Sequence, residues 1–167
     1  MFNQLTQRDI DAMQKEIEER KIVIRPKLLE DVKEARAHGD LSENFEYYAA
    51  KKEKNKNESR IRFLERMIKT AEIIPDDAAE DEIGMNSIVT VQFEEDGSEE
   101  TYTIVTTMRG NSLENLISVE SPIGKALMGH RAGDRVEVEV SKDYSYGLLI
   151  QKIEKDENME EHKLRDF

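Results

Sequence analysis

The sequence predicts an α+β protein, in which an antiparallel α-helical coiled-coil hairpin is followed by a small antiparallel β-sheet domain with one short helix. Two observations lead to this fold class. Apolar residues recur at helical spacing through most of the first 75 residues, and five short segments rich in β-branched residues follow after a proline and an acidic stretch. We therefore expect a hairpin over residues 1–75, a sheet domain over 76–154 and a polar tail over 155–167 that frays.

The first helical segment is expected from about Thr6 to the neighbourhood of Gly39. Thr6 is a suitable N-cap with Asp9 three residues later, and a stripe then continues through Ile10, Met13 and Ile17. Pro26 lies inside this pattern, so it must kink the helix or restart it. Gly39 suits the C-terminus because glycine adopts the left-handed conformation at little cost.

The second helical segment is expected to start between Asp40 and Asn44 and to end before Pro75. Its helical spacing is carried by Phe45, Tyr48, Ala49, Ile61, Leu64, Ile68 and Ala71. Two segments of matched length, each about 45 to 50 Å long at 1.5 Å per residue, predict a hairpin with "GDLSEN" at its tip. Residues 51–60 offer no apolar side chain to the facing arm, so we expect polar or lysine-stem contacts there.

The composition changes abruptly after Pro75. Residues 76–100 contain ten acidic residues and no lysine or arginine. Strands are expected at "SIVTVQF", "TYTIVTT", "NLISVE", "RVEVEV" and "GLLIQKI", with a turn at "EEDGSEE". The segment "SPIGKALMG" predicts a short helix with Ser121 as its N-cap and Pro122 at its first position.

Charge and composition exclude several classes of function. The net charge of -12 argues against simple electrostatic adhesion to nucleic acid or to an anionic membrane, so any basic surface must be local. The absence of cysteine excludes disulfides, thiolate metal sites and a cysteine nucleophile. No apolar run approaches the roughly 18 residues of a membrane span, and the start lacks the pattern of a signal peptide. We expect a soluble, cytoplasmic protein with no membrane partner.

Three carboxylates follow one another at a spacing of three in the predicted tip, at Asp40, Glu43 and Glu46. If the second helix begins near Asp40, they share one face, and Asp40 with Glu43 matches a capping box. A capping box does not need a projecting stalk, however. Magnesium commonly takes one or two protein carboxylates, with substrate phosphates and water supplying the other ligands. The alternative to a helix cap is therefore an acid pair that completes a metal site on another molecule.

A local basic patch follows the predicted tip. Residues 51–69 carry eight basic and three acidic side chains, and one ridge at a spacing of four is formed by Lys52, Lys56 and Arg60. The ridge is either a solvated helix face or a surface that guides the hairpin along a phosphate chain.

Two segments carry a resemblance to a known family. "EARAHGDLSENFEYYAAKKE" resembles the tip signature of the bacterial Gre transcript-cleavage factors, and "ISVESPIGKALMGHRAGDRVEVEV" resembles their FKBP-like C-terminal domain. The resemblance covers nearly the whole chain in the right order. It implies a coiled coil that enters the secondary channel of RNA polymerase and a C-terminal domain that docks on the channel rim. The tip then stimulates the polymerase's own hydrolysis of backtracked RNA, so the protein alone is not an enzyme.

The resemblance also implies roles for individual residues. The catalytic acids would be Asp40 and Glu43, which would hold a second Mg²⁺ and its attacking water inside the polymerase, with no metal bound by the isolated protein. Residues that shape the tip would be Ser42, Asn44 and Tyr47. Contact with backtracked RNA would come from the basic ridge, and docking on polymerase from Ser121, Pro122, Ile123 and Gly124.

Other interpretations stay open at this stage. A non-catalytic regulator of the same channel would have the same fold, and a coiled-coil adaptor without a polymerase connection is a third class. The "SPIGKAL" helix suggests a prolyl isomerase, although the family's version of this domain is not known for that activity. Phe45 and Tyr48 are bulkier than the alanine and histidine expected in a typical family tip. His38 titrates near neutrality in principle, but a lone surface histidine is more often a bystander. The expected partners are bacterial RNA polymerase and backtracked nascent RNA, with the protein itself a monomer.

Overall fold

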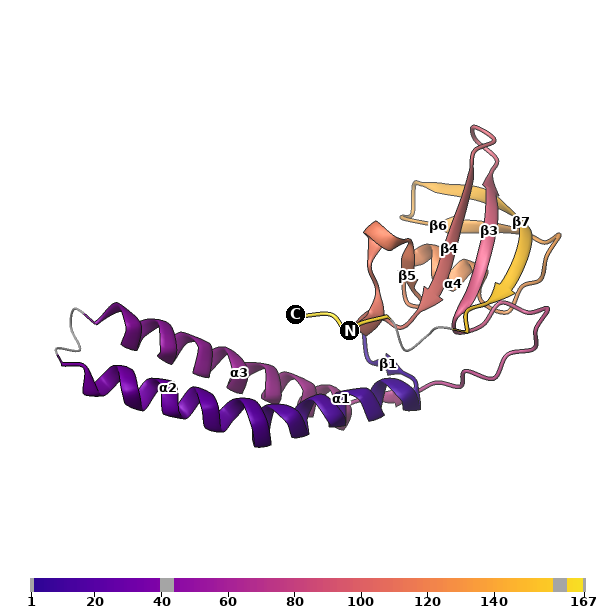
Figure 1. The fold of residues 1–167 in the computed structure, drawn as a ribbon. Coiled ribbons are helices and arrows are strands. Elements are labelled where there is room, and N and C mark those ends of the chain that lie inside the picture. The colour runs from indigo at the N-terminus through magenta and orange to yellow at the C-terminus, as the bar shows by residue number, and fades with distance from the viewer. Residues whose placement is uncertain (1, 40–43, 158–161, 167) are drawn as a thin grey trace. The chain divides into compact units, whose positions relative to one another are not determined.

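The computed structural model describes residues 2–39, 44–157 and 162–166 (Figure 1). The chain divides into two compact units, one formed by Ile10–Ala71 and the other by Met1–Asp9 together with Glu72–Phe167. The first unit is helical and the second is built on a β-sheet, which confirms the predicted α+β class. Strand β1 (Gln4–Leu5) pairs in parallel with β2 (Glu72–Ile73) and so joins the N-terminal segment to the sheet unit.

The first helical arm consists of three consecutive segments, α1 (Gln7–Glu19), η1 (Arg20–Ile24) and α2 (Arg25–Ala37). The predicted cap at Thr6 is confirmed, since Asp9 N–H donates to Thr6 Oγ1 (3.3 Å) and Thr6 N–H to Asp9 Oδ2 (3.1 Å). Pro26 lies in the first turn of α2 and lacks the N–H that an α-helix would use. The segment before it is a π-helix, in which Arg25 N–H reaches back to Arg20 O. The chain thus stays helical through the proline.

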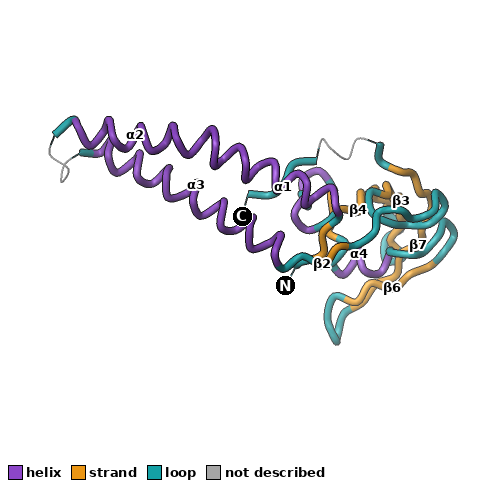
Figure 2. Tube along the Cα trace, turned by 90° about the horizontal axis from the view of Figure 1, so that it is seen from below, coloured by secondary structure: helices purple, strands orange, loops and turns teal. Residues whose placement is uncertain are grey.

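The second arm is the single helix α3 (Phe45–Lys69), which runs antiparallel to α2. The two helices lie side by side in both views of the molecule (Figures 1 and 2). Towards the C-terminal end of α3 the buried side chains are apolar, namely Ile61, Leu64 and Met67. Further towards its N-terminus, the residues buried in the hairpin are polar.

A set of hydrogen bonds and ion pairs joins the two arms in this polar part. Glu16 accepts from Arg60 Nε (2.8 Å) and from Arg20 Nε (2.7 Å), and Arg20 Nη1 donates to Asn57 Oδ1 (2.9 Å). Further ion pairs across the arms are Arg25–Glu58 and Lys21–Glu65, both at 2.9 Å. The prediction of polar contacts over residues 51–60 is therefore confirmed, although arginine, asparagine and glutamate make them rather than lysine stems.

Besides the β1–β2 pair, the described part of the sheet unit contains a five-stranded sheet in the order β5-β4-β3-β7-β6. These strands are β3 (Ser87–Phe93), β4 (Glu99–Val105), β5 (Leu116–Ser118), β6 (Arg135–Glu139) and β7 (Ser145–Lys155). All five predicted strands are present. The sheet is not purely antiparallel, because β4 and β5 pair in parallel. Two 3-10 turns in the intervening connection, η2 (Thr107–Arg109) and η3 (Ser112–Glu114), allow the chain to return in the same direction.

The core of this unit lies between the sheet and helix α4 (Pro122–Leu127). Leu127 of α4 is fully buried with the alternating inward residues of the strands, such as Val89 and Val91 of β3. The acidic stretch before β3 adds Ile83 and Met85 to the same cluster. Its acids lie outside the core, and one of them, Asp81, pairs with Arg131 at 3.2 Å.

Both chain ends are attached to the sheet unit. Asp9 is only 1% exposed and accepts from Thr106 Oγ1 (2.7 Å) and from Arg109 Nε. Near the C-terminus, Arg165 N–H donates to Met108 O (2.6 Å), and Arg109 Nη1 donates to His162 O (2.5 Å). Residues 162–166 of the predicted polar tail thus make hydrogen bonds to the segment that contains η2.

Candidate functional site

The predicted acids Asp40 and Glu43, and Ser42 between them, lie outside the described residues. The residues that flank them show that α2 ends at Ala37 and that α3 begins at Phe45. The N-cap of α3 is Asn44, so the interpretation of Asp40 as the cap of this helix is wrong. Of the three predicted carboxylates, Glu46 is the one within the described residues, and it lies in the first turn of α3.

Asn44 joins the two arms through its side-chain amide. Its Oδ1 accepts from Tyr47 N–H (3.0 Å), which caps α3, and its Nδ2 donates to the carbonyl oxygen of Ala35 near the end of α2 (2.5 Å). Gly39, with φ of +121°, takes the left-handed region predicted for the end of the first arm. One amide thus satisfies an orphan donor of α3 and gives Ala35 O, which also accepts from His38 N–H, a second hydrogen bond from the other arm.

Tyr47, the second described residue predicted to shape the tip, packs against Arg36 of α2. The Arg36 guanidinium lies 5.6 Å from the centre of the Tyr47 ring, and its hydrogen bond to the phenol lowers the pKa of Tyr47 below the ordinary value. Beside this contact, His38 Nδ1 lies 3.3 Å from Glu46 Oε2. Both contacts join the two arms, so they support the same end of the hairpin that Asn44 closes.

Phe45 and Tyr48 begin the outward face of α3. Phe45 is 85% exposed and Tyr48 is 51% exposed, and two exposed lysines of the predicted ridge, Lys52 and Lys56, follow at steps of four. The placement of Arg60 in that ridge is wrong, because its side chain is only 6% exposed and is bound to Glu16. The exposed basic ridge therefore consists of Lys52 and Lys56.

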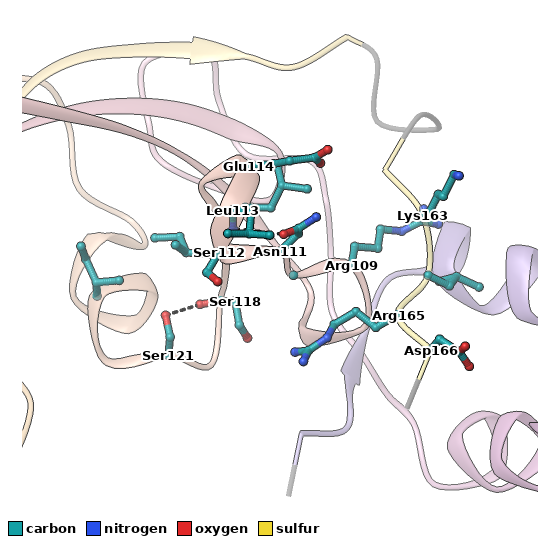
Figure 3. Close-up of a pocket in the computed structure, with 15 residues that line it drawn as sticks. Arg109, Asn111, Ser112, Leu113, Glu114, Ser118, Ser121, Lys163, Arg165 and Asp166 are labelled. Atoms are coloured by element: carbon teal, nitrogen blue, oxygen red, sulfur yellow. Dashed lines mark hydrogen bonds between the residues drawn. The ribbon is translucent and has the colours of Figure 1, made fainter.

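The four predicted docking residues lie at the start of α4, and two of them have structural roles. Ser121 Oγ caps the helix by accepting from Gly124 N–H (3.1 Å) and donates to Ser118 O (2.6 Å; Figure 3). A Cβ on Gly124 would lie 2.1 Å from the same carbonyl oxygen, so only glycine fits there. Pro122 is exposed and Ile123 is half-buried. Ser121 is also half-buried, so Gly124 is the one predicted docking residue that is fully buried.

A cavity of about 750 Å³ lies beside this helix start, and Ser121 and Ile123 are part of its lining. Residues 111–114 and 163–166 also line it, the latter from the C-terminal tail (Figure 3). The tail is held here by the two bonds to Met108 and Arg109 described above. The predicted docking element and the tail thus border the same hollow.

No group of three or more potential metal-binding side chains occurs within the described ranges, from which Asp40 and Glu43 are missing. The donor types of this acid pair suit magnesium, because carboxylate oxygens are hard ligands. Among the helices that the structure describes, none combines the length and apolar character needed to cross a membrane.

Comparisons with known proteins agree over both units. Residues 3–73 match the family model "Transcription elongation factor, N-terminal", and residues 78–155 match "Transcription elongation factor, GreA/GreB, C-term". The chain is 43% identical over 152 residues to the transcription elongation factor GreA of Streptococcus sanguinis, covering 90% of this chain and 94% of the relative. The GreA of Streptococcus pneumoniae (strain G54) is 42% identical over the same lengths.

Among solved structures, GreA factor homolog 1 of Thermus thermophilus is 26% identical, with 90% of this chain and 97% of that chain covered and a TM-score of 0.41. A GreA/GreB elongation factor from Nitrosomonas europaea is 25% identical, with coverage of 56% and 78% and a TM-score of 0.40.

Proposed function

Because this chain belongs to the GreA/GreB family of transcription elongation factors, we propose that it rescues arrested transcription by stimulating RNA cleavage within RNA polymerase. In this proposal the helical hairpin enters the secondary channel of the polymerase, and the sheet unit docks at the rim through Pro122 and Ile123. In this proposal the isolated factor does not cleave RNA. It completes the active site of the enzyme to which it binds.

The observation that carries this proposal is the similarity to GreA over 94% of the relative's length, which includes both units in the same order. The structure supports it at the end of the hairpin. Asn44 caps α3, so Asp40 and Glu43 are not required as helix caps.

The proposed chemistry divides between the polymerase and this chain. Hydrolysis of a phosphodiester by two metals requires one ion at the leaving oxygen and one that orients and acidifies water. Asp40 and Glu43 would hold the second magnesium ion jointly with the polymerase, and that ion supplies the activated water. The role of this chain is to position the acids. The Asn44 side chain, which is hydrogen-bonded to both arms, and the Arg36–Tyr47 contact between the arms serve this role.

A non-catalytic regulator of the same channel remains the second candidate function. It would use the same fold and docking surface, and it would slow RNA synthesis by occupying the channel. The presence of both Asp40 and Glu43 favours the cleavage factor, because a blocker has no need for two carboxylates of the type that suits magnesium three residues apart in the sequence.

The decisive experiment compares wild type with the double variant Asp40→Asn, Glu43→Gln on a stalled, backtracked complex. These changes keep the side-chain shapes and remove the negative charge that a magnesium site requires. We expect short 3′ RNA fragments with wild type only, while the double variant still competes with wild type for polymerase. Polymerase alone is the control for intrinsic cleavage. Equal fragment yields from both proteins would remove the proposed role of the two acids, and inhibition without cleavage by wild type would favour the channel regulator.

A further inference from the structure

The outward face of α3 begins with two aromatic side chains whose exposure folding does not explain. Phe45 is 85% exposed and Tyr48 is 51% exposed, so the hairpin gains little buried apolar area from either ring. Other residues of the same helix face the opposite arm, and Tyr47, Ala50 and Lys54 are half-buried accordingly. The two rings are therefore presented to a partner rather than to the hairpin itself.

The exposed face of α3 that begins with the two rings continues with two lysine side chains. The series Phe45, Tyr48, Lys52 and Lys56 follows steps of three, four and four, which keeps all four side chains within one stripe of an α-helix. All four are exposed. At 1.5 Å per residue the stripe is about 16 Å long, with its aromatic end at the first turn of α3 and its basic end further along the arm.

Neighbouring contacts hold the aromatic end in place. The Tyr48 ring meets Tyr47 edge to face, with 5.5 Å between centroids, and Tyr47 is itself fixed by Arg36. The nearest acidic residue in sequence, Glu46, has its carboxylate beside His38 of the other arm. The Tyr48 ring is thus held by a neighbouring ring before a ligand arrives, and the carboxylate between Phe45 and Tyr48 in sequence lies beside His38.

Exposed aromatic rings followed by lysines form the pattern by which proteins bind single-stranded nucleic acid. Bases stack on the rings, and the basic side chains follow the phosphates. We propose that Phe45 and Tyr48 form a base-stacking platform for the unpaired 3′ segment of RNA, with Lys52 and Lys56 holding its phosphates. Every base has a flat face, so this platform accepts RNA with little regard to sequence. The inference rests on the proposed function for the identity of the RNA.

The first test uses the isolated full-length chain and no polymerase. Aromatic ring signals of Phe45 and Tyr48 are followed by NMR while a six-residue oligoriboadenylate, or an oligomer of the same length without bases, is added at low salt. We expect ring-current shifts of both side chains with the adenylate only, and shifts of the Lys52 and Lys56 signals with both oligomers. Rings that do not respond at millimolar adenylate, or that respond equally to the oligomer without bases, would overturn the proposal.

The second test measures cleavage in the backtracked complex as a function of factor concentration. The double variant Phe45→Ala, Tyr48→Ala is expected to raise the half-maximal concentration about tenfold, as for the loss of one or two stacked bases. Tyr48→Phe keeps a ring and should behave as wild type. Phe45→Leu keeps an apolar side chain without a ring and should lose part of the effect. A leucine variant as active as wild type would instead indicate apolar contact with protein and would overturn the proposal.

The two tests separate this inference from the function on which it rests. Wild type that promotes no cleavage, but whose rings shift with the adenylate, refutes the cleavage function and leaves the stacking platform standing. Cleavage that is equal in wild type and the double alanine variant refutes the platform and leaves the cleavage function standing. Far-UV circular dichroism confirms that the variants fold, which we expect because both side chains are exposed.

Discussion

Asn44 offers the sharpest test of how this fold builds its functional end. Replacement by alanine removes both the α3 cap and the donation to Ala35 O. The cap contributes about 1 kcal/mol, and the second hydrogen bond contributes about 1 kcal/mol. Asn44→Ala should therefore destabilise the hairpin by about 2 kcal/mol. Asn44→Asp keeps an acceptor for Tyr47 N–H but loses the donor, so about 1 kcal/mol should be lost.

The loss is measured by urea unfolding of the full chain, followed through helical circular dichroism. With a slope of about 2 kcal/mol per molar urea, the alanine variant should lower the midpoint by about 1 M and the aspartate variant by about half as much. Asn55→Ala, which replaces an exposed asparagine inside the same helix, is the matched control and should not lower the midpoint, because alanine is the better helix former. Equal urea midpoints for Asn44→Ala and the control would refute the stabilising role of the two Asn44 hydrogen bonds. An equal decrease of the midpoint in the alanine and aspartate variants would refute the role of the amide donor.

Three further predictions follow from charged contacts. Burial opposes ionisation of Glu16, but the hydrogen bonds from Arg60 and Arg20 outweigh it and lower the pKa below the ordinary 4.5. As the pH falls, the Glu16 carboxylate therefore takes up a proton in the unfolded chain before it does so in the folded one, and the stability of the hairpin should decrease below about pH 4.5. The decrease should be less steep in Glu16→Gln, and urea midpoints measured over pH check this. Charge reversal at Lys52 and Lys56, to glutamate, should weaken cleavage and reduce its dependence on salt concentration. Cleavage that is unchanged across a salt series would show that the two lysines are only part of a solvated helix face. Asp9→Asn should destabilise the sheet unit by about 3 kcal/mol, because it leaves a buried arginine without its anion. Thermal unfolding measures this, and an unchanged transition would contradict it.

Local patterns in the sequence were sufficient for most of the secondary structure. Strand β3 has the bounds of "SIVTVQF", and α4 begins at the proline of the Ser-Pro pair, with the serine as its cap as predicted. The sequence predicts the start of α3 only as a range from Asp40 to Asn44, with a capping-box pattern at Asp40 and Glu43. Tyr47 N–H and Ala35 O select Asn44 together, and Ala35 lies nine residues away on the other arm. A capping rule considers the residues of one helix, so it cannot predict the hydrogen bond to Ala35 O on the other helix.

The errors share the same origin in contacts between distant residues. Arg60 fits a ridge of basic residues in sequence, but its partner Glu16 lies 44 positions earlier and draws it into the hairpin. Strands β1 and β2 have two residues each, so neither has a pattern to detect. The parallel pairing of β4 and β5 also escaped prediction, because only ten residues connect the strands, fewer than parallel strands usually need. The acid pair itself was identified through its resemblance to a family rather than through geometry.

The π segment η1 has a consequence for how the length of the first arm can vary. Arg20, Ile24, Leu28 and Val32 are all half-buried at steps of four residues. In an ideal α-helix each such step passes a full turn by about 40°, so three steps would rotate the buried stripe by about 120°. The wider π turn takes up one surplus residue and keeps the stripe in line. A descendant of this protein that lost one residue within η1 would close the turn to an ordinary α-helix, and both faces of the arm would stay where they are. A loss elsewhere in the arm would turn all later side chains by about 100°.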